Sequence, residues 1–436
     1  MTATTDNLSE LQKDIFKRIS NNETAELKAL LAANKIKIDF VDKNGMYPLQ
    51  HAAYKGNKEI VQLLLDQGAD VNLCQHEHKY TALHFAALSG NPEVCHLLMC
   101  HGAKLTTTNS VGRTAAQMAA FVGNHNCVAA INNYIPKANI DYYIKPQGLQ
   151  KEPMLPVHLA DSFHKFIMQV NVHPVRVAMT LQTCSGLIDY LPKIQKVLES
   201  MCHREMSKSS EANEIIAFKY HYLSCVIGEL IKCQKRQEAR KTEKTESEKL
   251  SQENKNKDDE KNNDNHKEQD TSKRTNKDKD EKTKTDLVEL FIRALLKCNK
   301  ADGFPEYQEA FLREVVREFP FRESIIFRQL VAALAGSDPP PAASIISAAI
   351  NGQRGFSDNS QSCVTCSEER ANKKCSKCKA VQYCDRECQR LHWFLHKKEC
   401  ARVNGGISGL NFKASNIDKA DIANAVKNEI ESLKIE

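Results

Sequence analysis

Three segments of the chain repeat one pattern, and they begin 34 and 33 residues apart, at Tyr47, Thr81 and Thr114. They read YPLQHAAYKGNKEIVQLLLDQGADVN, TALHFAALSGNPEVCHLLMCHGAKLT and TAAQMAAFVGNHNCVAAINN. A weaker copy, NNETAELKALLAANKIKIDFVD, begins at Asn21 and has no legible first-helix motif. Each copy carries short apolar faces at helical spacing that cannot be buried within one repeat. The copies must therefore stack, which predicts a solenoid of short helix pairs.

The repeats resemble the ankyrin repeat in their L-H-x-A-A, G-N and G-A-D-V-N marks. That resemblance implies about four repeats over residues 8–140, the first of them degenerate. Paired alanines allow neighbouring repeats to approach closely, and a glycine ends each first helix where a left-handed residue is needed. These positions are Ala52-Ala53, Ala86-Ala87 and Ala119-Ala120 for the alanines, and Gly56, Gly90 and Gly123 for the glycines.

The hairpin tip of the middle repeat departs from the other two. Gly45 and Gly112 precede their repeats by two residues, whereas the equivalent position in the longer tip QHEHKY is Lys79. Ankyrin arrays usually bind partners along this edge, so the tip is a candidate contact surface. Variation of a loop without function is the alternative. The candidate contact residues are His76, Glu77, His78 and Tyr80.

Beyond the repeats, a proline-containing connector over residues 141–155 leads to a helical domain predicted for residues 156–350. Residues 236–286 interrupt that domain with 15 Lys/Arg and 15 Asp/Glu, and Leu250 is their only large aliphatic residue. Such a tract buries too little apolar surface to offset its ordering entropy, so we expect a disordered insertion. In the tail, residues 401–436, apolar residues at helical spacing predict a short amphipathic helix.

Seven cysteines and a spaced histidine lie in the 38 residues from Cys363 to Cys400. The spacing is C-x2-C-x8-C-x2-C-x5-C-x3-C-x7-H-x3-C, and eight ligands make two tetrahedral sites. No stretch reads as a secretory signal or a membrane span, so we expect a reducing, cytoplasmic location where such cysteines bind metal. Thiolate with imidazole favours two structural Zn²⁺ ions, because no coordination position is left for substrate. Spacing alone leaves sequential and interleaved pairings open.

This segment resembles a MYND-type zinc finger, in which the two sites are interleaved. The resemblance implies that Cys363, Cys366, Cys384 and Cys388 hold one zinc, and that Cys375, Cys378, His396 and Cys400 hold the other. His392 lies near the ligand face, but the pattern leaves it out. The segment has a surplus of four basic residues, which largely balances seven thiolates and two Zn²⁺ ions. Nucleic-acid binding is therefore not required to explain its charge.

In MYND fingers that bind proline-rich peptides, a glutamine and a tryptophan shape a groove beside a short strand. Here Gln389 and Trp393 match them, one helical turn apart, and the strand is Ala380 to Tyr383. An aromatic face suits a preformed polyproline segment. Packing of Trp393 against the tail or the helical domain is the alternative.

The chain as a whole resembles the ankyrin repeat and MYND domain-containing proteins, in stretches such as NSVGRTAAQMAAFVG, DYYIKPQGLQKEP, DGFPEYQEA and HWFLHKKEC. The insertion departs from that family's pattern. The predicted fold class is mainly α, with an ankyrin solenoid, a helical middle domain and a two-zinc finger. The resemblance implies a non-enzymatic adaptor that binds signalling proteins and helps its clients reach primary cilia. The apolar runs are too short to cross a bilayer, so we expect no membrane insertion.

Two other function classes match parts of this sequence. A nuclear corepressor scaffold that recruits proline-rich motifs stays open, and the basic segment KRQEARK over residues 235–241 favours it. A SET-and-MYND lysine methyltransferase is disfavoured, because only 36 residues follow Cys400 and no N-H-S-C-type motif is present.

Overall fold

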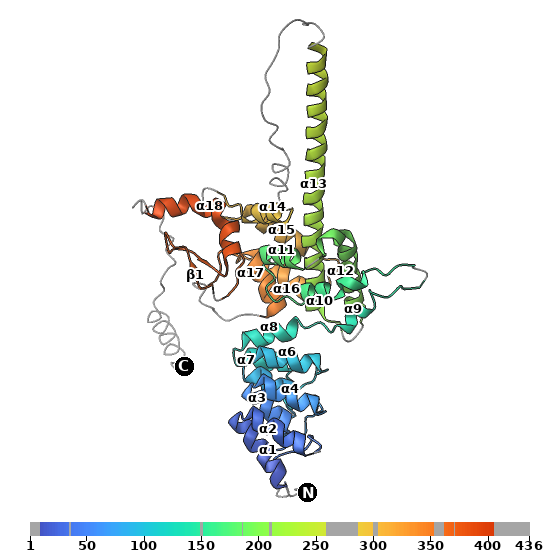
Figure 1. Ribbon diagram of the computed structural model, residues 1–436, viewed down its shortest axis with the longest axis vertical. Helices are drawn as coiled ribbons and strands as arrows, with labels where there is room; N and C mark the ends of the chain where they lie inside the picture. Colours follow the sequence, from blue (N-terminus) through green and yellow to red (C-terminus); the bar gives the residue numbers. More distant parts are fainter. Residues whose placement is uncertain are drawn as a thin grey trace, which may run out of the picture.

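The computed structural model describes residues 9–34, 36–148, 151–184, 186–208, 212–258, 287–299, 304–352, 362–369 and 371–404. The described chain is mainly helical, as predicted. A column of short helix pairs leads into a bundle of longer helices, and a small finger lies beside that bundle (Figure 1). In this part of the chain no helix is both long and apolar enough to cross a bilayer.

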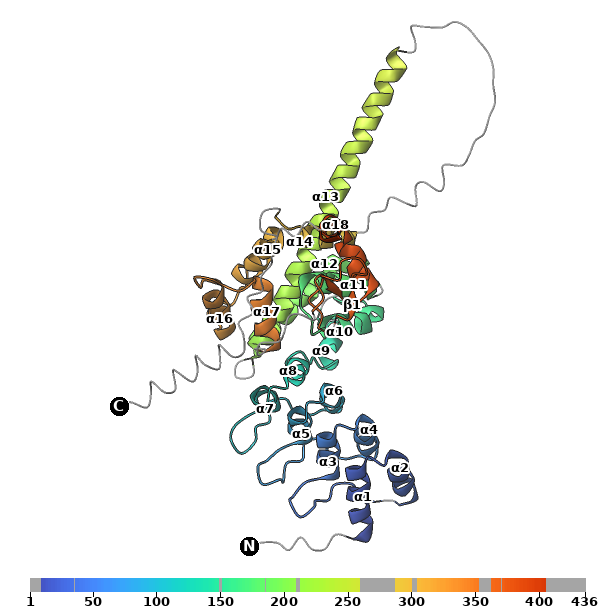
Figure 2. The same ribbon diagram turned by 90° about the vertical axis from the view of Figure 1, so that its left-hand side faces the viewer.

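The column consists of four helix pairs. First helices stack on first helices and second helices on second helices, as the repeat pattern requires (Figure 2). The long connections before α3, α5 and α7 project to one side of the column (Figure 2). The pairs are α1 (Glu10–Asn21) with α2 (Thr24–Ala33), α3 (Pro48–Lys55) with α4 (Lys58–Asp66), α5 (Ala82–Leu88) with α6 (Pro92–Cys100), and α7 (Ala115–Phe121) with α8 (His125–Asn132).

Local sequence signals explain where these helices begin and end. Thr81 and Thr114 accept hydrogen bonds from the backbone of the first turn and complete capping boxes at α5 and α7. Gly56 ends α3 with a φ of 74°, in the left-handed region that favours glycine. The degenerate first repeat does have a first helix, α1, which begins at a Ser9 and Gln12 capping box that the repeat alignment missed.

The middle of the chain forms one bundle around the helix α13 (Glu214–Asp258). This helix contacts α11, α12, α14, α15, α16 and α17, so the helical blocks on either side of the insertion share one hydrophobic core. The other helices are α9 (Ala138–Asp141), α10 (Ala160–Ile167), α11 (Pro174–Thr183), α12 (Leu191–Met206), α14 (Leu287–Leu296), α15 (Glu306–Arg317), α16 (Ile325–Leu334) and α17 (Ala342–Asn351), with 3-10 turns at Val157–Leu159 and Ile188–Tyr190.

The expectation of a disordered tract over residues 236–286 is wrong for its first part. Helix α13 continues to Asp258 and projects well beyond the bundle (Figure 1). Residues 241–258 contain many lysines and glutamates and no glycine or proline, which suits a helix, whereas a count of charged residues does not reveal helix formation. Residues 259–286 lie outside the described residues, as does the tail helix predicted around Ile422, Val426, Ile430 and Leu433.

The connector of residues 141–155 is held at both ends. Tyr143 and Leu155 are buried in the core of the bundle, and the N–H of Leu155 donates to the carbonyl of Tyr143 at 2.9 Å. The array itself joins the bundle through α8 and α17, where the Asn133 Nδ2 donates to Asn351 Oδ1 at 2.7 Å. Array and bundle therefore meet at a packed, hydrogen-bonded junction.

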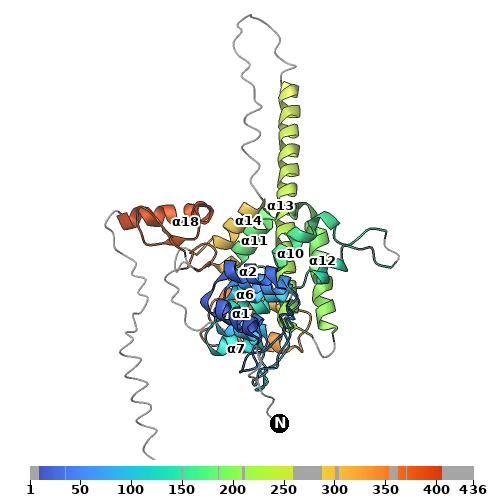
Figure 3. The same cartoon turned by 60° about the horizontal axis from the view of Figure 1, so that its bottom comes forward.

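The finger consists of strands β1 (Lys373–Lys374) and β2 (Gln382–Tyr383), paired antiparallel, and helix α18 (Arg386–Asn404). It lies at the side of the bundle opposite to α12 (Figure 3). Asn171, just before α11, donates to the carbonyl of Cys366 at 3.1 Å and to the carboxylate of Glu368 at 2.7 Å. The finger is thus fastened to the bundle by specific polar contacts as well as by packing.

Candidate functional site

The finger brings its eight candidate ligands together in two separate groups. Within each group, one ligand atom from every residue lies within 4.8 Å of the others. The pairing is interleaved along the chain, as the MYND resemblance implied, and not sequential. One group is Cys363, Cys366, Cys384 and Cys388, and the other is Cys375, Cys378, His396 and Cys400.

The spacing of the sulfur atoms fits a tetrahedral metal. With metal–sulfur bonds of about 2.3 Å, two thiolates of one tetrahedral Zn²⁺ lie about 3.8 Å apart. The Sγ atom of Cys366 lies 3.7 Å from that of Cys384 and 3.6 Å from that of Cys388. In the second group, the Sγ atoms of Cys375 and Cys400 are 3.8 Å apart. The Nε2 atom of His396 lies 3.3 Å from the Sγ atom of Cys378. Both groups could therefore hold an ion with little rearrangement.

The local fold explains how distant residues converge. Tight turns carry the two C-x2-C pairs, and α18 presents His396 and Cys400 on one face because they are four residues apart. A hydrogen bond from the backbone of Cys378 lowers the pKa of the Cys375 thiol to about 6. That favours the thiolate, which is the form that binds metal.

His392 is engaged elsewhere. Its Nδ1 atom lies 3.0 Å from the hydroxyl of buried Tyr383, and its ring stacks on that of His396 at 5.9 Å. It supports the second ligand group from the side, in agreement with its omission from the ligand pattern. Sequence spacing offered no signal for this role of Tyr383.

Helix α18 presents two neighbouring stripes, and one of them contacts α14 through Arg390 and Phe394, although Phe394 is itself 38% exposed. Arg390 donates to the carboxylate of Glu289 on α14 at 2.9 Å, and the guanidinium of Arg293 lies 5.8 Å from the ring of Phe394. Trp393 remains 36% exposed, and its indole meets the ring of His396 edge-on at 6.0 Å. The bundle therefore packs against the stripe of Arg390 and Phe394.

The second stripe carries Gln389 and Trp393. Gln389 is half-buried one turn before the exposed indole. Strand β2 has fewer free backbone groups for pairing with a partner strand than its sequence suggested. The carbonyl of Gln382 already accepts from the N–H of Val364 at 3.1 Å. On this face, contact of a partner with the indole side chain is therefore better supported than main-chain pairing with β2.

The tip of the middle ankyrin hairpin forms an aromatic cluster. Lys79 has a φ of 53° and takes the left-handed position that Gly45 and Gly112 occupy in the other tips. The ring of His76 stacks on that of Tyr80 at 5.7 Å, and both meet the ring of Phe85 edge-on. Glu77 and His78 are exposed.

Two aromatic residues of this cluster escaped the sequence reasoning. Phe85 comes from α5, and its ring also meets that of Tyr54, which is 55% exposed. Neither residue lies in a hairpin, so inspection of loops alone could not find them. The aromatic spacing within the first helices of successive repeats was the available signal.

Comparison with known proteins agrees with this architecture. Residues 17–109 match the family description "Ankyrin repeats (3 copies)", and residues 363–400 match "MYND finger". The chain is 31% identical over 393 residues to Dauer abnormal formation protein 25 of Caenorhabditis elegans, which covers 89% of each chain. This chain belongs to the family of ankyrin-repeat proteins with a C-terminal MYND finger.

Other relatives match single modules. A Drosophila melanogaster protein named Zinc finger MYND domain-containing protein 10 homolog is 43% identical over 52 residues, which are 12% of this chain and 11% of that protein. Putative ankyrin repeat protein FPV219 of Fowlpox virus is 38% identical over 64 residues, 14% of this chain and 15% of that protein. Ankyrin repeats and MYND fingers are protein-interaction modules, so this ankyrin–MYND protein carries two parts suited to binding other proteins.

Proposed function

We propose that this ankyrin–MYND protein is a non-enzymatic adaptor with two partner-binding surfaces. One is the aromatic tip of the middle ankyrin hairpin, and the other is the stripe of Gln389 and Trp393 on the MYND finger. The observation that carries the proposal is the exposure of Trp393 on a helix whose neighbouring stripe contacts α14 through Arg390 and Phe394. An exposed indole beside a rigid support suits a proline-rich segment of a partner.

The proposed resident ions are two structural Zn²⁺. The donor sets, four cysteines in one group and three cysteines with one histidine in the other, are those that zinc prefers in structural sites. All four positions of each group come from the protein, so the ions would hold the finger together. They would thereby fix the helix that presents Trp393.

A rigid connection between two surfaces gives an adaptor an advantage. The array joins the bundle through the buried Asn133 and Asn351 pair, and the finger joins it through Asn171 and Arg390. If one client carries both recognised segments, binding of the first raises the effective concentration of the second.

The proposed setting is the cytoplasm with a ciliary association, where the protein helps signalling proteins reach cilia. This part of the proposal rests on the family resemblance alone. The rival setting, the nucleus, relied on the basic segment of residues 235–241. Arg236 of that segment is ion-paired with the buried carboxylate of Glu229 at 3.1 Å, which weakens its case as a free import signal.

The test is proximity labelling in ciliated cells with the wild-type chain, Trp393→Ala and Phe394→Ala. Phe394 is the matched control, since it is a neighbouring exposed aromatic residue that faces α14. We expect labelling of membrane-signalling and ciliary proteins to be lost with Trp393→Ala and kept with Phe394→Ala, with two zinc ions in all three chains. An unchanged partner set in Trp393→Ala would refute the role of the indole. A set dominated by chromatin proteins would favour the corepressor scaffold.

A further inference from the structure

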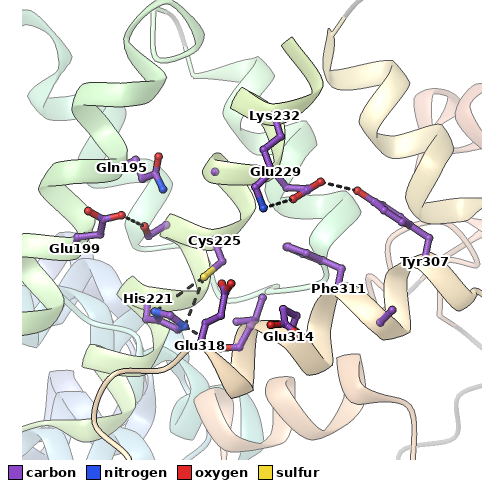
Figure 4. Close-up of a pocket in the computed structure, with 14 residues that line it drawn as sticks. Gln195, Glu199, His221, Cys225, Glu229, Lys232, Tyr307, Phe311, Glu314 and Glu318 are labelled. Carbon is purple, nitrogen blue, oxygen red and sulfur yellow. Dashed lines mark hydrogen bonds and ion pairs between the residues drawn. The ribbon is translucent and has the colours of Figure 1, made fainter. Parts of the chain in front are cut away.

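A pocket of about 650 Å³ opens in the bundle between α12, α13 and α15 (Figure 4). Helix α13 forms its floor with His221, Cys225 and Gly228. Glu199 lines it from α12, Phe311 lines it from α15, and Glu318 lines it from the C-terminal cap of α15. None of these residues belongs to the hairpin tip or to the finger, so neither proposed partner surface accounts for the pocket.

The lining carries more acidic than basic side chains. Its acidic side chains are Glu199, Glu229, Glu314 and Glu318, and its one basic side chain is Lys232. That lysine is already committed, because its Nζ atom lies 3.1 Å from the carboxylate of Glu229. Among the described residues, no basic side chain lies within ion-pair distance of Glu199 or Glu318, whereas Glu314 pairs with Arg317 at 2.9 Å.

The two carboxylates without an ion pair come from different elements, Glu199 from α12 and Glu318 from the C-terminal end of α15. Glu199 accepts from the hydroxyl of Ser224 at 3.3 Å, and Glu318 points from α15 towards Cys225 (Figure 4). Burial, followed by the charges of Glu318 and Glu199, raises the pKa of the Cys225 thiol to about 12. The thiol therefore stays protonated and adds no charge of its own at neutral pH.

His221 does not neutralise these carboxylates either. Its Nε2 atom donates to the carbonyl of Val315 at 2.8 Å. Burial lowers the pKa of this imidazole below its ordinary value, even though Val315 and Glu199 act in the opposite direction. A neutral imidazole and a neutral thiol leave Glu199 and Glu318 without an ion-pair partner among the described residues.

The remaining surface is apolar and aromatic. Phe311 faces into the space above α13, and the ring of Tyr307 lies beyond it, with its hydroxyl donating to Glu229 at 3.1 Å (Figure 4). Gly228 leaves space for the side chain of Gln195, since a Cβ atom at position 228 would lie 3.0 Å from its Nε2 atom. The pocket thus combines an aromatic wall with the carboxylates of Glu199 and Glu318.

We propose that this pocket binds the guanidinium group of an arginine side chain from a partner protein. A guanidinium is planar, stacks on an aromatic ring and offers five donors, so it can bridge two carboxylates. A lysine ammonium matches the charge but lacks the fork and the plane. A metal ion fits less well, because among the described residues only the two finger groups bring three or more ligand atoms within 4.8 Å.

Calorimetric titration of the full zinc-loaded chain tests the proposal. The probe is acetyl-Gly-Arg-Gly-amide, and the matched control peptide carries citrulline, which keeps the shape of arginine without its charge. The variants are Glu199→Gln and Glu318→Gln, with Glu323→Gln as control, an exposed glutamate paired with Arg328 outside the pocket. Thermal unfolding and zinc content verify that each variant is folded.

We expect the arginine peptide to bind the wild-type chain and Glu323→Gln equally, and each pocket variant about tenfold or more weakly, since each loses one charge-assisted hydrogen bond. A third peptide, with lysine in place of arginine, should bind more weakly than the arginine peptide. Equal binding of the citrulline peptide, or affinity unchanged in both pocket variants, would overturn the proposal. Binding of free arginine without binding of the peptide would overturn the assignment to a protein partner.

Discussion

The ankyrin array and the MYND finger hold their shapes by opposite means. Each repeat of the array is buried by its neighbours, and aliphatic side chains such as Leu64 and Leu98 are completely enclosed. The finger has two strands of two residues each and one helix, and many of its buried residues are the cysteines themselves. The array therefore depends on apolar packing spread over many contacts, whereas the finger depends on a few bonds to metal.

The largest expected effect is the loss of one finger ligand. Cys388→Ser removes a buried thiolate whose Sγ atom also lies 3.9 Å from the Sδ atom of Met179 in the bundle. Structural Zn²⁺ contributes on the order of 10 kcal/mol to small metal-dependent folds, so we expect zinc content to fall from two ions per chain to one or fewer. Cys100→Ser, an exposed cysteine outside both groups, should keep two ions. Two ions retained in Cys388→Ser would contradict the ligand assignment.

An equivalent change in the array should act on packing alone. Leu98→Ala leaves a cavity at a fully buried position, which costs about 2–5 kcal/mol of unfolding free energy. Leu97→Ala, at the half-buried neighbouring position, should cost clearly less. Urea unfolding followed by circular dichroism measures both, with zinc content expected to stay at two. Loss of zinc in Leu98→Ala would show that the stability of the finger depends on the packing of the array.

Residues 168–173 of the bundle contact both regions, and a lysine is buried beneath this segment. The Sδ atom of Met168 accepts from the N–H of Ile135 at the end of the array, and Asn171 bonds to the finger. Lys219 of α13 is fully enclosed, and its Nζ atom donates to the carbonyl of Gln169 at 2.8 Å. Burial lowers the pKa of this amine from 10.5 to about 7.

That shift predicts a pH dependence with a definite sign. Between pH 7 and about 10, the unfolded chain holds a proton on Lys219 that the folded chain lacks, so stability should rise with pH. The slope is at most about 1.4 kcal/mol per pH unit. Lys219→Met removes this dependence. We expect the unfolding free energy of the wild type minus that of the variant to increase from pH 7.5 to 9.5. Parallel curves for the two chains would refute the buried neutral amine.

Much of this architecture could be predicted because its signals are local. The repeat period predicted the stacked pairs, and the Thr81 and Gly56 positions marked helix ends that the structure reproduces. The cysteine spacing, read with the family resemblance, predicted both ligand groups. Helix α1 was missed because its signal is a capping box without repeat identity, and the pocket was missed because Glu199 and Glu318 are far apart in the chain. Convergence of that kind depends on tertiary packing, which no local pattern records.

The smallest expected effect concerns the contact that joins the finger to the bundle. Burial would raise the pKa of Glu289, but hydrogen bonds from Arg390 and Arg293 lower it below its ordinary value. Glu289 is 16% exposed and Arg390 is 51% exposed, so water screens much of their attraction. A double-mutant cycle of Arg390→Ala with Glu289→Ala should give a coupling of about 0.5–1 kcal/mol, which weakens in high salt.

That small coupling sharpens the contrast between an array held by apolar packing and a finger held by metal bonds. If metal alone shapes the finger, Arg390→Ala should keep two zinc ions per chain while hydrogen exchange at the N-terminal turns of α18 accelerates. The change would then alter how firmly the Trp393 stripe is positioned, without altering the fold that presents it. Loss of zinc in Arg390→Ala would mean instead that docking on α14 is part of what folds the finger, and the finger could no longer be treated as held by its metal bonds alone.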